Sequence, residues 1–331
     1  MWRLLISFLF ISAIAIAAIL FAVDSKVKQP LLITESQFYT VKSGTSFHTL
    51  LKDLDNKHWL QNSVLLKVFA KLNPELTSLK TGTYQLSAGM SLTALLTLLN
   101  SGVEHQFKIT FVEGSTFKEW LAKLVEAEKI KPTLNDKTAQ QILTLLNSKY
   151  SHPEGLFFPD TYAYTAGSSD LDILRLAHQR MLIELEQSWQ QRVKDLPYKN
   201  AYQALIMASL IEKETGQVFE QPIIAAVFIN RLAKKMRLQT DPTIIYGLGE
   251  RYTGDITYAN IREKTAYNTY QIKALPPTPI AMPGKSAIEA SLHPDKHSYL
   301  YFVSKGNGEH YFSSSLREHN NAVNKYIRGK K

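Results

Sequence analysis

The stretch AYQALIMASLIEKETGQVFEQPIIAAVFINRLAKKMRLQTDPTIIYG, residues 201–247, decides the fold. Residues 205–211 leave no wide polar stripe around a helix, and a helix that is apolar on all sides is buried. Gly216 follows the last turn and predicts a glycine C-cap. The stretch therefore predicts a buried helix around which this part of the chain is organised.

Two glutamates, Glu212 and Glu214, lie in the last turn of this predicted helix. The helix dipole is negative there, so ionising a carboxyl group costs more than usual. A carboxyl group held beside apolar surface can keep its proton at neutral pH and donate it. The two side chains point to opposite sides, so only one can face a given cleft. The pattern also allows a structural role, in which the acids pair with Lys213, Arg231 or Lys234.

A second buried helix follows, because residues 223–229 form another apolar run and Pro222 suits a first helical turn. This helix ends near Asn230 and Arg231, which could reach a cleft or brace it. Residues 238–243 then place polar side chains together on a turn. The stretch thus predicts a helical hairpin with a polar turn after it.

Composition limits the classes of function. The 331 residues carry a formal net charge of +9 and contain no cysteine, which excludes disulfides and thiolate nucleophiles. A basic chain favours anionic partners, but no nucleic-acid motif or phosphate loop is present, so nucleic acid is not an expected partner. His293 and His297 have the spacing of two metal ligands, but Pro294 follows the first and the segment does not match the H-E-x-x-H pattern, so no metal is expected. No G-x-S-x-G nucleophile motif occurs.

The N-terminus predicts a membrane anchor. Residues 4–23 form 20 positions without a charge, about the length that spans a bilayer. A signal peptide cleaved after residues 15–17 is the alternative, although the apolar run continues past that point. Lysines and arginines flank both ends, so they do not set the orientation. We expect an anchor over residues 1–23 and a polar tether over residues 24–35.

Residues 36–104 predict a small domain. A strand from Phe38 enters a turn at Gly44, helices follow over residues 47–54 and 64–72, and a second strand covers residues 82–86. This strand–helix–helix–strand order resembles a LysM-type carbohydrate-binding module. A packing domain without affinity for sugars is the alternative.

Residues 105–331 predict a mixed α/β domain, which makes the whole chain α+β. Residues 154–164 form an aromatic-rich loop or strand that suits sugar stacking or core packing. Gly306-Asn307-Gly308 predicts a hairpin between strands at residues 299–304 and 309–313, and residues 316–327 predict a closing helix.

Several sequence blocks in this domain resemble one family. They are IEKET (211–215), VFINRL (227–232), LQTDPT (238–243), IYG (245–247), AYNTY (266–270) and YLYFV (299–303), with FPDTY (158–162) upstream. Their order and spacing are similar to those of the YceG-like family, the endolytic murein transglycosylases. This resemblance implies a membrane-anchored enzyme that cuts peptidoglycan glycan strands internally, outside the cytoplasm at the inner (plasma) membrane. It also implies that the enzyme works near peptidoglycan synthases and needs no cofactor.

The resemblance further implies the site residues. The catalytic acid is Glu214, with Glu220 as the second candidate, and the residues that line the cleft and bind substrate are Gln239, Thr240, Asp241, Tyr267 and Asn268. One acid suffices if the 6-hydroxyl of N-acetylmuramic acid is the nucleophile, leaving 1,6-anhydro ends. The alternative is a catalytically silent peptidoglycan-binding scaffold.

Overall fold

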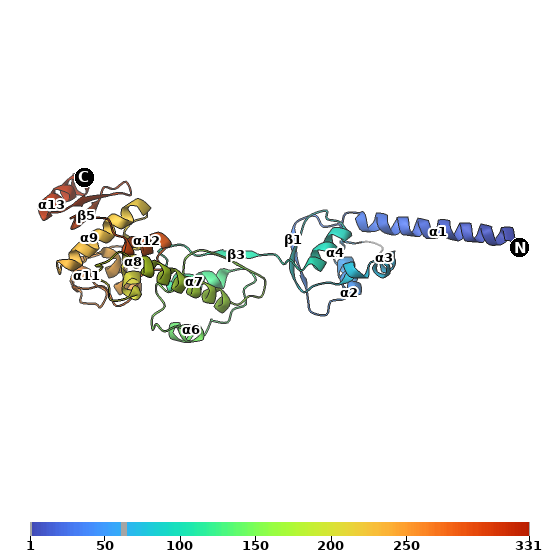
Figure 1. The fold of residues 1–331 in the computed structure, drawn as a ribbon, viewed down its shortest axis with the longest axis horizontal. Coiled ribbons are helices and arrows are strands. Elements are labelled where there is room, and N and C mark those ends of the chain that lie inside the picture. Colours follow the sequence, from blue (N-terminus) through green and yellow to red (C-terminus); the bar gives the residue numbers. More distant parts are fainter. Residues whose placement is uncertain (1, 61–64, 331) are drawn as a thin grey trace. The chain divides into compact units, whose positions relative to one another are not determined.

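The computed structural model describes residues 2–60 and 65–330. The chain forms two compact units: an N-terminal unit of Met1–Phe107 with Ala163–Gly167, and a C-terminal unit of Lys108–Tyr162 with Ser168–Lys331. In the part of the chain that the structure describes, helices outnumber strands, and the strands pair in three two-stranded sheets (Figure 1). The predicted α+β class is confirmed.

The N-terminal unit has strands and helices in alternation. Its elements are α1 (Trp2–Lys28), β1 (Gln37–Val41), α2 (Phe47–Asn56), α3 (Leu66–Leu72), η2 (Pro74–Thr77), β2 (Gly82–Leu86) and α4 (Leu92–Ser101). β1 pairs antiparallel with β2, from Gln37 opposite Leu86 to Val41 opposite Gly82. The leucines of α2 and α4 pack with Tyr84 in the core of this unit. Val64, the first apolar residue of the predicted second helix, lies outside the described residues.

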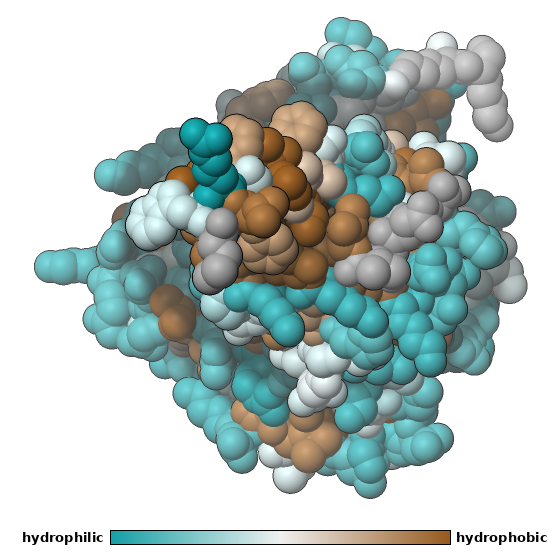
Figure 2. Space-filling view, turned by 90° about the vertical axis from the view of Figure 1, so that its right-hand side faces the viewer, coloured by the Kyte–Doolittle hydropathy of each residue, from teal (hydrophilic) through white to brown (hydrophobic). Residues whose placement is uncertain are grey.

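Helix α1 is long and apolar enough to cross a membrane, which is compatible with the predicted anchor. Its large side chains are exposed, as for Trp2, Leu4 and Phe8, and Figure 2 shows apolar side chains gathered at the end where α1 lies. Residues 24–35 differ from the polar tether predicted there. The helix continues to Lys28, and Val27, Leu31 and Ile33 are buried because these apolar side chains pack into the core of the N-terminal unit.

The C-terminal unit is mostly helical. It contains β3 (Phe107–Thr110), whose first residue belongs to the other unit, α5 (Phe117–Glu126), α6 (Ala139–Leu145), β4 (Thr161–Tyr164), whose last two residues belong to the other unit, α7 (Asp170–Gln191), α8 (Ala201–Glu214), η3 (Val218–Glu220), α9 (Gln221–Ala233), α10 (Asp241–Leu248), η4 (Gly249–Arg251), α11 (Tyr258–Arg262), α12 (Lys285–Leu292), β5 (Tyr301–Ser304), β6 (His310–Ser313), α13 (Leu316–Tyr326) and η5 (Arg328–Lys330). β5 and β6 form the predicted antiparallel hairpin.

Helix α8 is the centre of this unit. Every residue from Ala204 to Ile211 is buried, and α8 packs against α7, α9, α10 and α12 (Figure 1). The predicted buried helix is confirmed, as is Pro222 in the first turn of α9. The predicted glycine C-cap is wrong. The helix ends because Thr215 is extended, with φ of −147°, and its hydroxyl donates to Glu220, so Gly216 is not needed in the left-handed conformation.

Candidate active site

Glu214 is the last residue of α8, and the loop after it is firmly held. The backbone N–H of Thr215 donates to the Ile211 carbonyl, and its hydroxyl donates to Glu220 at 3.2 Å. Glu220 is only 2% exposed and also accepts from the His310 N–H and contacts His310 Nδ1, each at 2.8 Å. All the oxygens of Glu220 are thus occupied in linking α8 to β6. The second candidate for the acid therefore supports the loop.

The Glu214 carboxyl group faces a cavity of about 450 Å³. The side chains that line it come from α8, α9, α10, the hairpin, α13 and the segments before α10 and after α11: Glu214, Arg231, Leu238, Gln239, Asp241, Tyr270, Tyr301, Phe302, Leu316, His319 and Asn320. Most of these groups are polar or aromatic. Such a lining offers hydrogen bonds and flat apolar faces, which match the hydroxyl groups and the apolar ring face of a sugar.

Burial raises the pKa of Glu214 to about 7, and the Asp241 carboxylate adds to this effect. Two groups oppose it. The Thr240 hydroxyl donates a hydrogen bond to Glu214 Oε1, and the Arg231 guanidinium is nearby, and both lower the pKa. Burial outweighs them, so Glu214 exchanges its proton readily near neutral pH, as a general acid must.

Arg231 both lines the cavity and braces it. The side chain is 8% exposed and donates to the carbonyls of Leu300 at 2.6 Å and Leu238 at 2.7 Å. It also reaches Gln239 Oε1 at 3.4 Å. A buried cation is costly unless it is hydrogen-bonded, and these bonds fix it beside Glu214.

Three of the predicted substrate-binding residues lie at the cavity. Gln239 and Asp241 line it, and Asp241 Oδ1 accepts from the Tyr270 hydroxyl at 2.7 Å. Thr240 is buried behind them and binds Glu214.

The structure does not bring the other two to this cavity. Asn268 is 1% exposed, and its amide donates to the carbonyls of Asn260, Ile261 and Glu263, so it holds the end of α11. Tyr267 is partly exposed, but its hydroxyl contacts Thr278 and its ring contacts Tyr246.

Sequence reasoning missed several lining residues. Tyr270 and Tyr301 stand in family blocks that were recognised but not assigned to the site. His319 and Asn320 lie in α13 and gave no signal. The ring of His319 stacks on Tyr301 with centroids 5.2 Å apart, and its Nδ1 is buried without a partner among the described residues. Burial lowers the pKa of His319, and Arg231 lowers it further, so a neutral imidazole faces the cavity.

Glu212 lies apart from this cavity. Its Oε2 accepts the N–H of Gly284 at 3.0 Å, just before the first turn of α12. Burial raises the pKa of Glu212 as well, but the carboxyl group is occupied in joining two helices. The two glutamates of α8 therefore contact different parts of the unit, as their spacing predicted.

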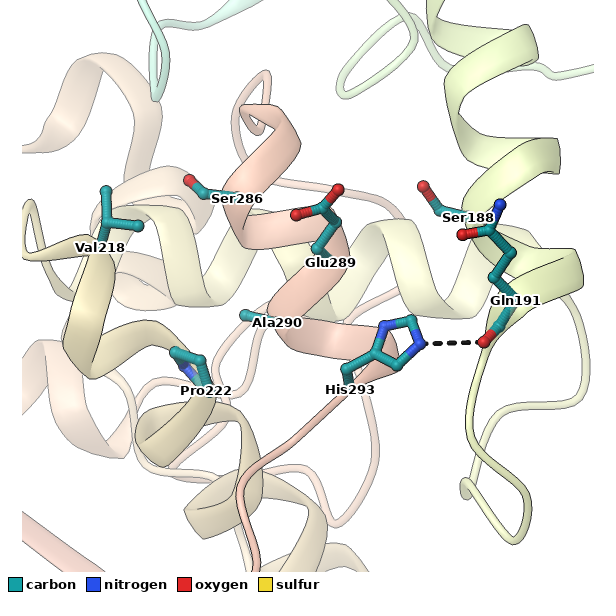
Figure 3. A pocket seen from close by; sticks show the side chains of 8 residues that line it. All are labelled: Ser188, Gln191, Val218, Pro222, Ser286, Glu289, Ala290 and His293. Carbon is teal, nitrogen blue, oxygen red and sulfur yellow. Dashed lines mark hydrogen bonds between the residues drawn. The ribbon is translucent and has the colours of Figure 1, made fainter.

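A second cavity, of about 320 Å³, lies between α7, α9 and α12 (Figure 3). His293 Nε2 lies 2.9 Å from the Gln191 carbonyl at its edge, while His297 contacts the Ile223 carbonyl, so the two imidazoles do not form a pair. The acid in this cavity, Glu289, is more than half exposed and lies 3.8 Å from Lys285. This cavity lacks a buried acid, in contrast to the one at Glu214.

Fold and site together define an α+β protein with one partly buried carboxyl group at the end of its central helix, able to transfer a proton within a polar cavity. The sequence profile of the YceG-like family matches residues 39–325. The chain therefore belongs to the YceG-like family, and the resemblance noted from its sequence blocks is confirmed.

Relatives of the chain carry one name. It is 34% identical over 310 residues to the endolytic murein transglycosylase of Bacillus subtilis strain 168, covering 88% of this chain and 84% of that protein. It is 26% identical to the endolytic murein transglycosylase of Streptococcus pneumoniae D39, covering 88% of this chain and 58% of that one. The solved structure of a YceG-like protein from Listeria monocytogenes is 29% identical, with a TM-score of 0.53 over 87% of this chain and 99% of that one.

Proposed function

We propose that this protein is an endolytic murein transglycosylase, a lyase that cuts the glycan strands of peptidoglycan between N-acetylmuramic acid and N-acetylglucosamine. Membership of the YceG-like family and the names of its relatives support this function. The observation that carries it is Glu214, an acid with a pKa of about 7 at the wall of a polar cavity.

A single acid suffices for this reaction. Ordinary glycosidases use two carboxyl groups, because one must protonate the leaving oxygen while the other acts as nucleophile or activates water. Here the 6-hydroxyl of the muramic acid attacks its own C1, so the nucleophile is already in place. The bond from C1 to the leaving oxygen breaks, and a bond from C1 to O6 forms.

Glu214 carries the proton through both halves of the step. Its carboxyl group protonates the leaving glycosidic oxygen, and the resulting carboxylate accepts the proton of the 6-hydroxyl. Thr240 and Arg231, which favour the carboxylate, stabilise it between the two transfers. The acid is restored, and no water is consumed. Asp241 is the other carboxyl group among the residues that line the cavity, and its Oδ1 accepts from Tyr270.

The N-terminal unit supports a proposal for where the protein works in the cell. Helix α1 serves as the single membrane anchor, with the catalytic unit outside the cytoplasm near the peptidoglycan synthases. The order β1–α2–α3–β2, with antiparallel strands, supports a LysM-like domain that binds glycan.

Product analysis tests the proposed reaction. Purified glycan strands are digested with the full-length protein in detergent, and the fragments are weighed by mass spectrometry. We expect 1,6-anhydro-muramic ends, lighter by one water than hydrolytic ends, and oligosaccharides early in the digest. Reducing muramic ends would indicate a hydrolase in which Asp241 acts as the second acid. No cleavage would favour the peptidoglycan-binding scaffold.

A further inference from the structure

Four tyrosines gather in the C-terminal unit outside the Glu214 cavity. This tyrosine cluster consists of Tyr150, Tyr202, Tyr246 and Tyr267, and each of its side chains is partly exposed. The rings of Tyr150 and Tyr202 are stacked, with centroids 4.7 Å apart and planes at 20°. Those of Tyr246 and Tyr267 meet edge to face at 4.9 Å. Burial is the main cause of the raised pKa of Tyr202 and of Tyr246, and Tyr267 raises both further, so the two pairs lie near each other.

Hydrogen bonds hold two tyrosines of the cluster, Tyr246 and Tyr267, in place. Glu154, which is 4% exposed, accepts from the Tyr246 hydroxyl at 3.1 Å and from the Phe117 N–H at 2.9 Å. The Tyr267 hydroxyl contacts Thr278 Oγ1 at 2.9 Å. Rings fixed in this way present apolar faces at little further cost in conformational entropy.

A cavity of about 320 Å³ adjoins the cluster. Tyr150 lines it, together with Asn147, Ser148, Lys149, Leu182, Leu185, Glu186 and Ala201, the residue before Tyr202. Amide, hydroxyl and charged groups thus stand beside aromatic faces. This combination suits the apolar face and the hydroxyl and acetamido groups of an amino sugar.

The cluster and the Glu214 cavity share two helices. α8 carries Tyr202 at its start and Glu214 at its end, about 18 Å apart at 1.5 Å per residue. α10 carries Asp241 at its start and Tyr246 about 8 Å further along. These separations correspond to the length of a few sugar rings.

We propose that the tyrosine cluster is a distal subsite that binds a sugar ring of the same strand whose bond is cut at Glu214. This inference rests on the proposed function and adds to it a reason for internal cutting. A strand that extends from the cavity to the cluster gains binding energy that a short end cannot gain, so bonds within long strands are preferred.

The test compares strand lengths with the full-length protein in detergent. Peptide-free glycan strands are separated into long and short fractions, and KM is measured for each. For Tyr202→Ala and Tyr150→Ala we expect KM to rise about tenfold more for long strands than for short ones, the size of one aromatic contact. Tyr258→Ala is the control, because Tyr258 is 82% exposed on α11, outside the cluster.

A second measurement separates stacking from folding. Tyr202→Phe keeps the ring and should restore most of the long-strand preference. Tyr150 lies in a loop, so Tyr150→Ala tests the subsite even if Tyr202→Ala is unstable. The subsite would be overturned if both alanine variants kept the wild-type ratio of KM for long strands to KM for short strands. It would also be overturned if Tyr202→Phe lost as much of the long-strand preference as Tyr202→Ala. In either case, cleavage by the wild type would still support the proposed function. Failure of the wild type to cleave any strand would overturn both.

Discussion

Replacing Glu214 with glutamine tests the proposed acid directly. Glutamine keeps the size of the side chain and can still accept the hydrogen bond from Thr240, but it has no proton to transfer. A pKa of about 7 leaves about half of the Glu214 side chains protonated at neutral pH, whereas the ordinary value of 4.5 would leave roughly one in 300. The cavity thus keeps a large population of acid ready, and the substitution removes it.

The expected loss of kcat is large. A positioned general acid contributes about 10²–10⁴-fold to a rate, so Glu214→Gln should lose that much at pH 7. Glu212→Gln is the matched control in the same helical turn. Its glutamine can still accept from Gly284, so at most a hydrogen bond of about 1 kcal/mol is weakened and most activity should remain.

The assay measures the soluble fragments released from purified peptidoglycan by each variant, with circular dichroism to show that both are folded. The assignment is refuted if Glu212→Gln loses more activity than Glu214→Gln, or if Glu214→Gln cleaves as fast as the wild type.

Three further outcomes follow from the structure. Thr240→Val removes the hydrogen bond that lowers the pKa of Glu214, so the pKa should rise and the alkaline limb of the kcat/KM profile should move to higher pH; a shift to lower pH would contradict the described bond. The pKa of Glu154 is about 7 in the folded protein, above its ordinary value of 4.5, so its protonated carboxyl group contributes to the free energy of unfolding. This contribution is complete below about pH 4.5 and is lost as pH rises through 7. In urea titrations Glu154→Gln should remove up to about 3 kcal/mol of this decline, and an equal decline in both proteins would exclude Glu154 as its source. A reporter enzyme fused after Lys331 should be active only in an exported compartment, and activity in the cytoplasm, or a mature chain beginning near Ile19, would contradict the anchored orientation.

Local patterns predicted the elements whose causes are local. The apolar run of α8 and the glycine-rich turn between β5 and β6 each contain their own signal. The end of α8 does not. Thr215 is extended because Glu220 and the hairpin hold it, and the hairpin lies about 90 residues away in sequence. Similarly, the burial of Val27 depends on a core formed later in the chain.

The site shows the same division. The resemblance placed Glu214, Gln239 and Asp241 in one region, and the structure gathers them at one cavity. A family block says which residues recur but not what they contact, so Asn268 was assigned to substrate although its amide holds backbone carbonyls. His319 could not be predicted, because nothing in its helix indicates that it lines the same cavity as an acid 105 positions earlier.

Because α13 forms one wall of the Glu214 cavity, the site is completed well after Glu214 itself has been synthesised. Leu316, His319 and Asn320 follow Glu214 by more than 100 residues and leave the ribosome after it, and Arg231 depends on the Leu300 carbonyl for one of its bonds. Until these residues are in place, the acid lacks both its enclosure and its fixed cation. A chain still being translated therefore lacks the complete site until α13 has been made.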